Sequence, residues 1–330
     1  MKMRNDKKQW TICSRVFSRR SQLGLVLMLL VAISVNAQEQ KSTKAKVNNT
    51  QRRIQIKNFS SAYVEPRNVE ILLPPNYSRK KKYSVIYMHD GQNVFDTKAS
   101  FSGKSWQTDK VLDSLYTDKA IIEAIIVAPW NTTRRFREYM PQKPDVAVDS
   151  AIRNNADKYK DEALKGLESD QYLKFLVKEL KPFIDRRFST KFGPEGTFIM
   201  GSSMGGLISL YAICEYPEVF GGAACLSTHW VALNGVFLKY IQDKLPDPSK
   251  HKIYFDHGTV ALDSLYAPYQ LQVDQLMRKQ GYLIHQNFVS LEIKGASHTE
   301  QDWYNRLHIP LQFLLSKDAH KTILNNQIIK

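Results

Sequence analysis

A serine set between glycines is the feature of this chain that most directly suggests chemistry. Residues 201–205 read G-S-S-M-G and fit the pattern G-x-S-x-G, with Ser203 at its centre. On a tight turn between a strand and a helix, such a serine projects its hydroxyl clear of the sheet, and the glycines avoid clashes in the strained turn. The pattern therefore predicts a nucleophilic serine, with the backbone N–H of Met204 stabilising the oxyanion that forms when it attacks a carbonyl.

A serine nucleophile of this kind needs a general base, which we expect downstream of it in the chain. His298 lies in a loop after the predicted strand 287–293 and before the last predicted helix, where an imidazole can reach over the nucleophile. Three other histidines are less suitably placed: His257, His285 and His308. We therefore expect His298 to accept the proton of Ser203.

An orienting carboxylate is expected between the serine and the histidine, in the loop that follows a predicted strand at 252–255. Asp263 lies a loop's length beyond that strand, where a carboxylate can reach back to the imidazole. Asp256 directly follows the strand and is the alternative, with a role in organising the loop. We favour Asp263 as the residue that holds the tautomer of His298 and stabilises its imidazolium form.

These residues must be positioned by a set of alternating strands and helices. Apolar runs predict strands at 54–59, 69–73, 84–88, 124–128, 197–200, 221–226, 252–255 and 287–293, and helical spacing predicts helices at 106–116, 172–188, 204–216, 268–280 and 303–315. Strands that alternate with helices indicate an α/β fold with a mostly parallel central sheet covered by helices on both faces. The polar stretch 131–169 lacks apolar periodicity and is predicted to be an insertion within a single domain, 52–330.

The N-terminal segment has the pattern of a secretory signal. Residues 1–22 are rich in lysine and arginine, the 13 residues 23–35 are almost entirely apolar, and V-N-A at 35–37 resembles a cleavage site. An apolar run of this length is shorter than the roughly 20 residues that span a bilayer. We therefore expect a signal peptide at 1–37, a polar linker at 38–51 and export to the periplasm or the extracellular space, the alternative being an uncleaved anchor.

The composition narrows the class of protein. With 330 residues, 43% of them hydrophobic, the chain is neither disordered nor a disulfide-built miniprotein. The net charge of +15 falls to +9 without residues 1–37, and the bases do not alternate with aromatic residues along a helix. We therefore expect no nucleic-acid partner and no stable membrane insertion after signal removal. For Cys214 and Cys225, buried free thiols are favoured over a disulfide.

Five segments together resemble the putative-esterase family of α/β-hydrolases, which includes feruloyl and acetyl-xylan esterases, S-formylglutathione hydrolases, mycolyltransferases and siderophore esterases. They are YMHDGQNVFD at 87–96, RRFREY at 134–139, GSSMGG at 201–206, YFDHGT at 254–259, and GASH at 295–298 with Trp303 and Arg306. The resemblance covers about 52–316. It implies the α/β-hydrolase fold, a second oxyanion N–H from Gln92, and no metal or cofactor. Some relatives in the siderophore branch work with a serine and a histidine alone, so a dyad stays open.

The expected activity is that of a secreted serine esterase acting on a small-molecule or carbohydrate-linked ester. Arg134 and Arg135 are candidates for binding an anionic or catecholate substrate, or are solvated loop charges. Trp130 either flanks the acyl pocket or belongs to the core. Two alternatives remain: an acyltransferase that uses the same site, and a non-catalytic binding protein of the same fold. The sequence leaves the ester itself open.

Overall fold

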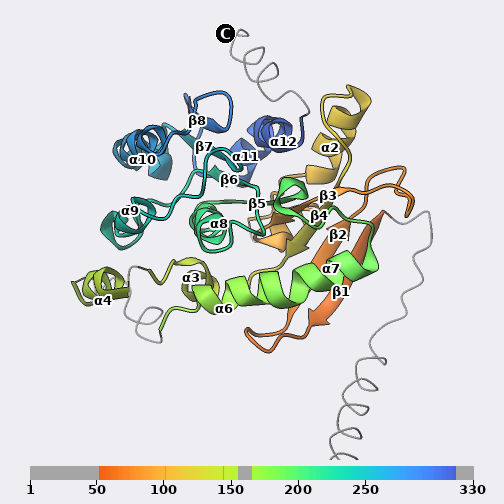
Figure 1. Ribbon diagram of the computed structural model, residues 1–330, viewed down its shortest axis with the longest axis horizontal. Helices are drawn as coiled ribbons and strands as arrows, with labels where there is room; N and C mark the ends of the chain where they lie inside the picture. The colour runs from red at the N-terminus through yellow and green to blue at the C-terminus, as the bar shows by residue number, and fades with distance from the viewer. Residues whose placement is uncertain (1–51, 101, 144, 155–165, 317–330) are drawn as a thin grey trace, which may run out of the picture. The chain divides into compact units, whose positions relative to one another are not determined.

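An eight-stranded sheet forms the centre of the computed structural model, which describes residues 52–100, 102–143, 145–154 and 166–316 (Figure 1). The strands are β1 (Arg53–Phe59), β2 (Arg67–Leu72), β3 (Ser84–Met88), β4 (Ala124–Pro129), β5 (Thr197–Ser202), β6 (Gly222–Leu226), β7 (Lys252–Gly258) and β8 (Phe288–Ile293). Their order is β1-β2-β4-β3-β5-β6-β7-β8. Strands β3 to β8 run parallel, and the β1–β2 and β2–β4 pairs are antiparallel. The predicted α/β class with a mostly parallel sheet is confirmed.

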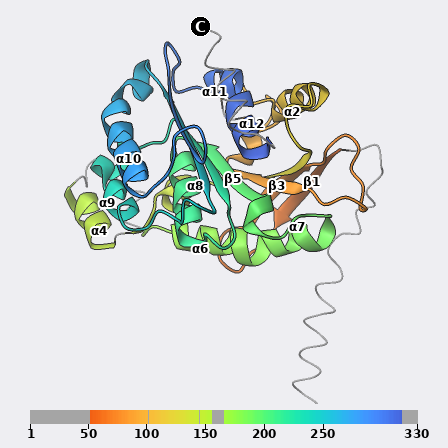
Figure 2. The ribbon, with the colours of Figure 1, turned by 45° about the horizontal axis from the view of Figure 1, so that its top comes forward.

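Helices cover both faces of the sheet (Figures 1 and 2). The helices are α2 (Thr108–Thr117), α3 (Arg135–Tyr139), α4 (Asp145–Asn154), α6 (Ser169–Lys174), α7 (Lys181–Arg187), α8 (Met204–Glu215), α9 (Phe237–Ile241), α10 (Ala267–Lys279), α11 (Glu300–Arg306) and α12 (His308–Leu315). One face packs against α2, α11 and α12, and the other against α6, α7 and α8.

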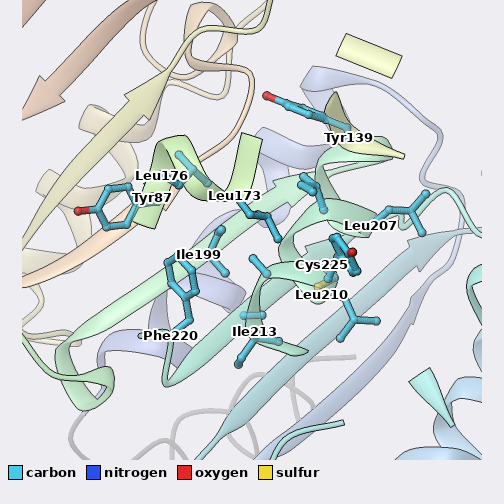
Figure 3. Close-up of a cluster of buried hydrophobic side chains, with 14 of the residues drawn as sticks. Tyr87, Tyr139, Leu173, Leu176, Ile199, Leu207, Leu210, Ile213, Phe220 and Cys225 are labelled. Carbon is cyan, nitrogen blue, oxygen red and sulfur yellow. The ribbon is translucent and has the colours of Figure 1, made fainter. Parts of the chain in front are cut away.

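The apolar core has two layers, one on each face of the sheet, because successive side chains of a strand point to opposite faces. On β3, Val85 and Tyr87 face the cluster that contains α8, while Ile86 and Met88 face the cluster that contains α12. Successive side chains of a strand point to opposite faces, so a strand with helices on both sides must be apolar throughout. Figure 3 shows the α8 layer, in which Tyr87 and Leu210 lie among the buried side chains.

Three predicted elements differ in detail from the structure. The helix expected at 303–315 is two helices, α11 and α12, because Pro310 has no N–H to donate to the carbonyl of Arg306. The helix expected at 172–188 contains a π-helical stretch, Phe175–Leu180, just before Pro182. Strand β7 continues to Gly258, so Asp256 lies within the strand and not after it.

The stretch 131–169, expected to be an insertion, contains α3 and α4 among its described residues. Helix α3 packs into the core: Tyr139 is buried, and so is Glu138, which receives two hydrogen bonds from the guanidinium of Arg67. This part of the stretch is therefore built into the domain. Apolar periodicity missed it because α3 is only five residues long.

The expectations for the N-terminal region fall on residues 1–51, outside the part of the chain that the structure describes. Among the described residues, no helix combines the length and the apolar character that crossing a bilayer requires. Cys214 and Cys225 are free cysteines, as the sequence favoured. Cys225 is buried on β6, as expected, whereas Cys214 is only partly buried. Burial raises the pKa of the Cys225 thiol.

Candidate active site

Ser203 occupies a strained turn between β5 and α8. Its backbone has φ 59° and ψ −122°, a conformation that costs free energy for a residue with a Cβ atom. The turn depends on a glycine before it, because a Cβ at position 201 would lie 2.8 Å from the carbonyl carbon and oxygen of Gly205. The backbone N–H of Ser203 donates to the carbonyl of Leu226 at 2.9 Å, which anchors the turn to β6.

Met204 and Gln92, the two residues predicted to supply oxyanion N–H groups, lie at the start of α8 and in the loop after β3. Met204 is the first residue of α8, and the N–H groups of a helix's first turn have no acceptor within the helix. Gln92 lies in a short 3₁₀-helix, Gly91–Asn93, just after β3. The loop that carries Gln92 approaches the nucleophile turn, since a Cβ on Gly205 would lie 3.5 Å from Oδ2 of Asp90. The helix dipole of α8 also favours negative charge at its N-terminus.

Asp90 is the charged centre of that loop. Its carboxylate accepts two hydrogen bonds from Arg135, each 2.7 Å long, and one from the side-chain amide of Asn131. Burial alone would raise the pKa of Asp90, but the charge and hydrogen bonds of Arg135 and the bond from Asn131 outweigh it and lower the pKa. Asp90 is therefore an anion in the folded protein.

The preceding residue, His89, is buried and neutral. Burial lowers its pKa to about 3, and its Nδ1 lies 2.9 Å from the hydroxyl of Tyr172. An imidazole with so low a pKa carries no charge at any pH at which the protein would work. His89 is therefore a packing residue next to the loop 90–92 and not a candidate base.

The predicted base, His298, is joined to a buried carboxylate. Its Nδ1 lies 2.6 Å from Oδ1 of Asp263, whose side chain is fully buried, while His298 itself is 16% exposed. Burial alone would raise the pKa of Asp263, but hydrogen bonds from His298, Ser227 and the N–H of Gly258 lower it. An ionised Asp263 fixes the proton of His298 on Nδ1, which leaves Nε2 to accept a proton.

Asp256, the alternative acid, is hydrogen-bonded to Arg306 and Tyr254. Its carboxylate receives hydrogen bonds from the guanidinium of Arg306 at 3.0 Å and the hydroxyl of Tyr254 at 2.8 Å. It therefore forms a buried ion pair on β7 instead of contacting His298. Of the two carboxylates that the sequence left open, the structure places Asp263 on the imidazole.

Ser227 links these two carboxylates and was not singled out from the sequence. Its hydroxyl donates to Oδ2 of Asp263 at 2.6 Å and accepts from Nε1 of Trp303 at 3.0 Å and from Arg306 at 2.8 Å. The residue type alone gives no signal of such a role, because serine is common in turns. Only its position directly after β6, at the carboxyl edge of the sheet, pointed to the site.

Aromatic rings enclose His298. The centroid of Trp303 lies 5.0 Å away, that of Tyr266 5.8 Å and that of His229 6.4 Å. Nδ1 of His229 lies 2.7 Å from the hydroxyl of Tyr266. The backbone N–H of His229 donates to the carbonyl of Ser203. His229 and Tyr266 were not identified from the sequence, because the folding of separate loops brings them to the base.

The residues predicted to bind substrate are all engaged with other protein groups. Arg134 pairs with Glu65 and Glu168, and Arg135 with Asp90. The indole N–H of Trp130 donates to Glu70 at 3.2 Å. Each of the three side chains remains partly exposed, so a role in substrate binding stays a prediction. Within the described residues, no group of three or more histidine, cysteine or acidic side chains is arranged to hold a metal ion.

The chain is similar to known proteins over most of its length. A family model described as "Putative esterase" matches residues 60–308. The protein YbbA of Bacillus subtilis (strain 168), itself uncharacterized, is 23% identical over 261 residues, covering 76% of this chain and 94% of that protein. An endo-1,4-beta-xylanase/feruloyl esterase of Xylanibacter ruminicola is 23% identical over 206 residues, which cover 61% of this chain and 24% of that protein.

Solved structures share the fold at low sequence identity. A ferulic acid esterase from Anaeromyces mucronatus matches with a TM-score of 0.56 and 19% identity, covering 85% of this chain and 96% of that one. Enterochelin esterase from Shigella flexneri matches with a TM-score of 0.57 and 19% identity, covering 80% of this chain and 58% of that one. At such identities the likeness establishes the arrangement of strands and helices.

Proposed function

This chain belongs to the putative esterase family of α/β-hydrolases and is a serine-type carboxylic ester hydrolase, and from this premise we propose that Ser203 forms an acyl-enzyme with His298 as general base. The observation that carries the proposal is the arrangement of three side chains. Ser203 stands on the strained turn between β5 and α8, and His298 is bound through Nδ1 to the buried Asp263 at 2.6 Å.

In the first step, the hydroxyl oxygen of Ser203 attacks the ester carbonyl carbon while Nε2 of His298 takes the hydroxyl proton. The negative charge on the carbonyl oxygen is stabilised by the N–H groups of Met204 and Gln92. His298 then gives its proton to the leaving alcohol, and the acyl group stays on Ser203. In the second step, a water molecule loses a proton to His298 and attacks the acyl-enzyme. His298 returns that proton to the oxygen of Ser203 as the bond between Ser203 and the acyl group breaks, which releases the carboxylic acid and restores the enzyme.

Asp263 acts through His298 in both steps. An ionised carboxylate behind Nδ1 stabilises the imidazolium that forms when Nε2 takes a proton. Because the pKa of Asp263 is lowered, the carboxylate remains an anion throughout the cycle. The bond from Ser227 on its second oxygen supports the same ionisation.

The proposed substrate is a small-molecule or carbohydrate-linked ester, and the proposed location of the enzyme is outside the cytoplasm. The first part is supported by the likeness to a ferulic acid esterase and to enterochelin esterase. The second rests on the basic and apolar pattern of residues 1–37. An ester panel of feruloyl, acetyl-xylan, trilactone and simple acyl compounds identifies the substrate class, and fractionation of expressing cells tests the export.

The mechanism is tested by assaying p-nitrophenyl esters with the wild type, Ser203→Ala and Ser202→Ala. Ser202 is the matched control, because it precedes the nucleophile on β5 and is buried. We expect Ser203→Ala to lose turnover and Ser202→Ala to keep it. Equal turnover in the wild type and Ser203→Ala would overturn the proposal. Adding an acceptor alcohol and identifying the products then separates hydrolysis from acyl transfer.

A further inference from the structure

Asn131, the second residue after β4, makes three hydrogen bonds to the oxyanion loop 90–92. Its side-chain Nδ2 donates to Oδ1 of Asp90, its Oδ1 accepts from Nε2 of Gln92 at 2.6 Å, and its backbone N–H donates to Oε1 of Gln92 at 3.1 Å. The first and last residues of the loop are thus attached to the same asparagine. None of the sequence motifs includes Asn131.

Between these attachments, the loop rests directly on the end of β4. A Cβ on Gly91 would lie 2.2 Å from the carbonyl oxygen of Ala128, so the two backbones are in contact and only glycine fits. Asp90 has a left-handed backbone, with φ 57° and ψ 49°. A loop in this conformation needs its surroundings to hold it, and Asn131 supplies bonds on both sides of the contact.

The charge on Asp90 determines how the side-chain amides of Asn131 and Gln92 are oriented. An ionised carboxylate only accepts hydrogen bonds, so the group of Asn131 that faces it must be the NH₂. The carbonyl oxygen of Asn131 then faces Gln92, which must present its own NH₂, and the carbonyl oxygen of Gln92 is left to accept the backbone N–H of Asn131. Only one set of donors and acceptors satisfies this chain of bonds, so the loop is held in one arrangement.

We propose that Asn131 is a positioning residue of the oxyanion site, which holds the backbone N–H of Gln92 where the oxyanion forms. The inference rests on the proposed function, because it assigns that N–H to the oxyanion. Asn131 acts through Gln92 and Asp90. Its loss is expected to weaken transition-state stabilisation without removing either N–H group, and to leave substrate binding unchanged.

The test compares Asn131→Ala with Gln142→Ala. Gln142 is the matched control, because it also lies between β4 and α6 and is half-buried. Its side-chain oxygen accepts a hydrogen bond from the backbone N–H of Asp170 at 2.9 Å. Complete loss of one oxyanion donor costs about 10²- to 10³-fold in rate. For a displaced donor in Asn131→Ala, we expect kcat to fall by about tenfold with KM unchanged, whereas Gln142→Ala keeps the wild-type kcat.

A second readout separates positioning from general loss of structure. An alkyl boronic acid forms a tetrahedral adduct with the nucleophile and mimics the transition state, whereas the carboxylic acid product mimics a ground state. Asn131→Ala is expected to bind the boronic acid about tenfold more weakly and the product equally well. Unchanged affinity for the boronic acid, or an equal loss for both ligands, overturns the proposal.

Gln92→Ala removes the other half of the amide pair but keeps the Gln92 backbone N–H. We expect it to lower kcat as Asn131→Ala does, and the double variant to be no worse than either single one, because both changes break the same link. Losses in kcat that add up in the double variant overturn the proposal. If Asn131→Ala does not fold, the boronic acid affinity is measured with Gln92→Ala alone. Failure of the proposed function is distinguishable, since Ser203→Ala would then keep its activity.

Discussion

The two regions that we propose to support Ser203 are built differently. On the proposed base side, the groups assigned to catalysis are the side chains of Asp263 and His298. Asp263 accepts a hydrogen bond from the fully buried Ser227, which in turn accepts one from Arg306. On the proposed oxyanion side, the groups assigned to catalysis are the backbone N–H groups of Met204 and Gln92, and side chains hold the loop 90–92. The oxyanion side also depends on a partly exposed arginine, Arg135. The base side therefore depends on which side chains are present, and the oxyanion side on how the backbone is held.

The largest effect is expected from removing the base. Without an imidazole, nothing accepts the proton of Ser203, and loss of the histidine in a comparable triad costs about 10⁶-fold in kcat. We expect His298→Ala to lower kcat by about 10⁴-fold or more in a p-nitrophenyl ester assay. His285→Asn is the control, because asparagine tolerates its positive φ. If both variants kept their activity, His298 would not be the base.

The next effect distinguishes the two carboxylates of the base side. Asp263→Asn places an amide against Nδ1 and favours the wrong tautomer of His298, which costs up to about 10⁴-fold in kcat. Asp256→Asn is expected to keep kcat within about tenfold but to lose about 3–5 kcal/mol of stability, because it leaves Arg306 buried without a counter-charge. Steady-state kinetics and urea unfolding measure the two effects. A reversed pattern would make Asp256 the acid, and no kinetic loss in either variant would favour a dyad.

These two regions also show what could be predicted from the sequence. The sequence predicts Ser203, His298 and both carboxylates because serine, histidine and aspartate have distinctive chemistry and lie in or near the segments that follow predicted strands. The strands were placed by their apolar runs. The roles of Ser227 and Asn131 could not be predicted from the sequence, because serine and asparagine are common in turns and these roles come from contacts with distant segments. The break between α11 and α12 could have been predicted from Pro310, because proline has no N–H to continue a helix's hydrogen bonds.

On the oxyanion side, a smaller effect is expected from Arg135→Lys. Lysine keeps the charge but not the two parallel bonds to Asp90, so the loop is held less firmly. We expect kcat to fall by about tenfold with little change in KM. Arg134→Lys, next to it and paired with Glu65 and Glu168, should leave kcat unchanged. A rise in KM alone in Arg135→Lys would instead indicate that Arg135 binds the substrate.

The smallest effect concerns stability at low pH. The pKa of Asp90 is lower in the folded protein than its ordinary value of 3.8, so its ion pair stabilises the fold above that value. This contribution disappears as the pH falls through the folded pKa. Asp90→Asn cannot titrate, so its stability should depend less steeply on pH below about 4 than that of the wild type. Urea unfolding at a series of pH values measures the slope, and identical slopes would contradict the ionised Asp90.

The most direct test of the account is to trap the acyl-enzyme. The wild type is mixed with a p-nitrophenyl ester, quenched in acid within milliseconds and analysed by mass spectrometry of its peptides. The account predicts one added acyl group on the peptide that contains Ser203, and none in Ser203→Ala. An acyl group on another residue, or full turnover by Ser203→Ala, would contradict it.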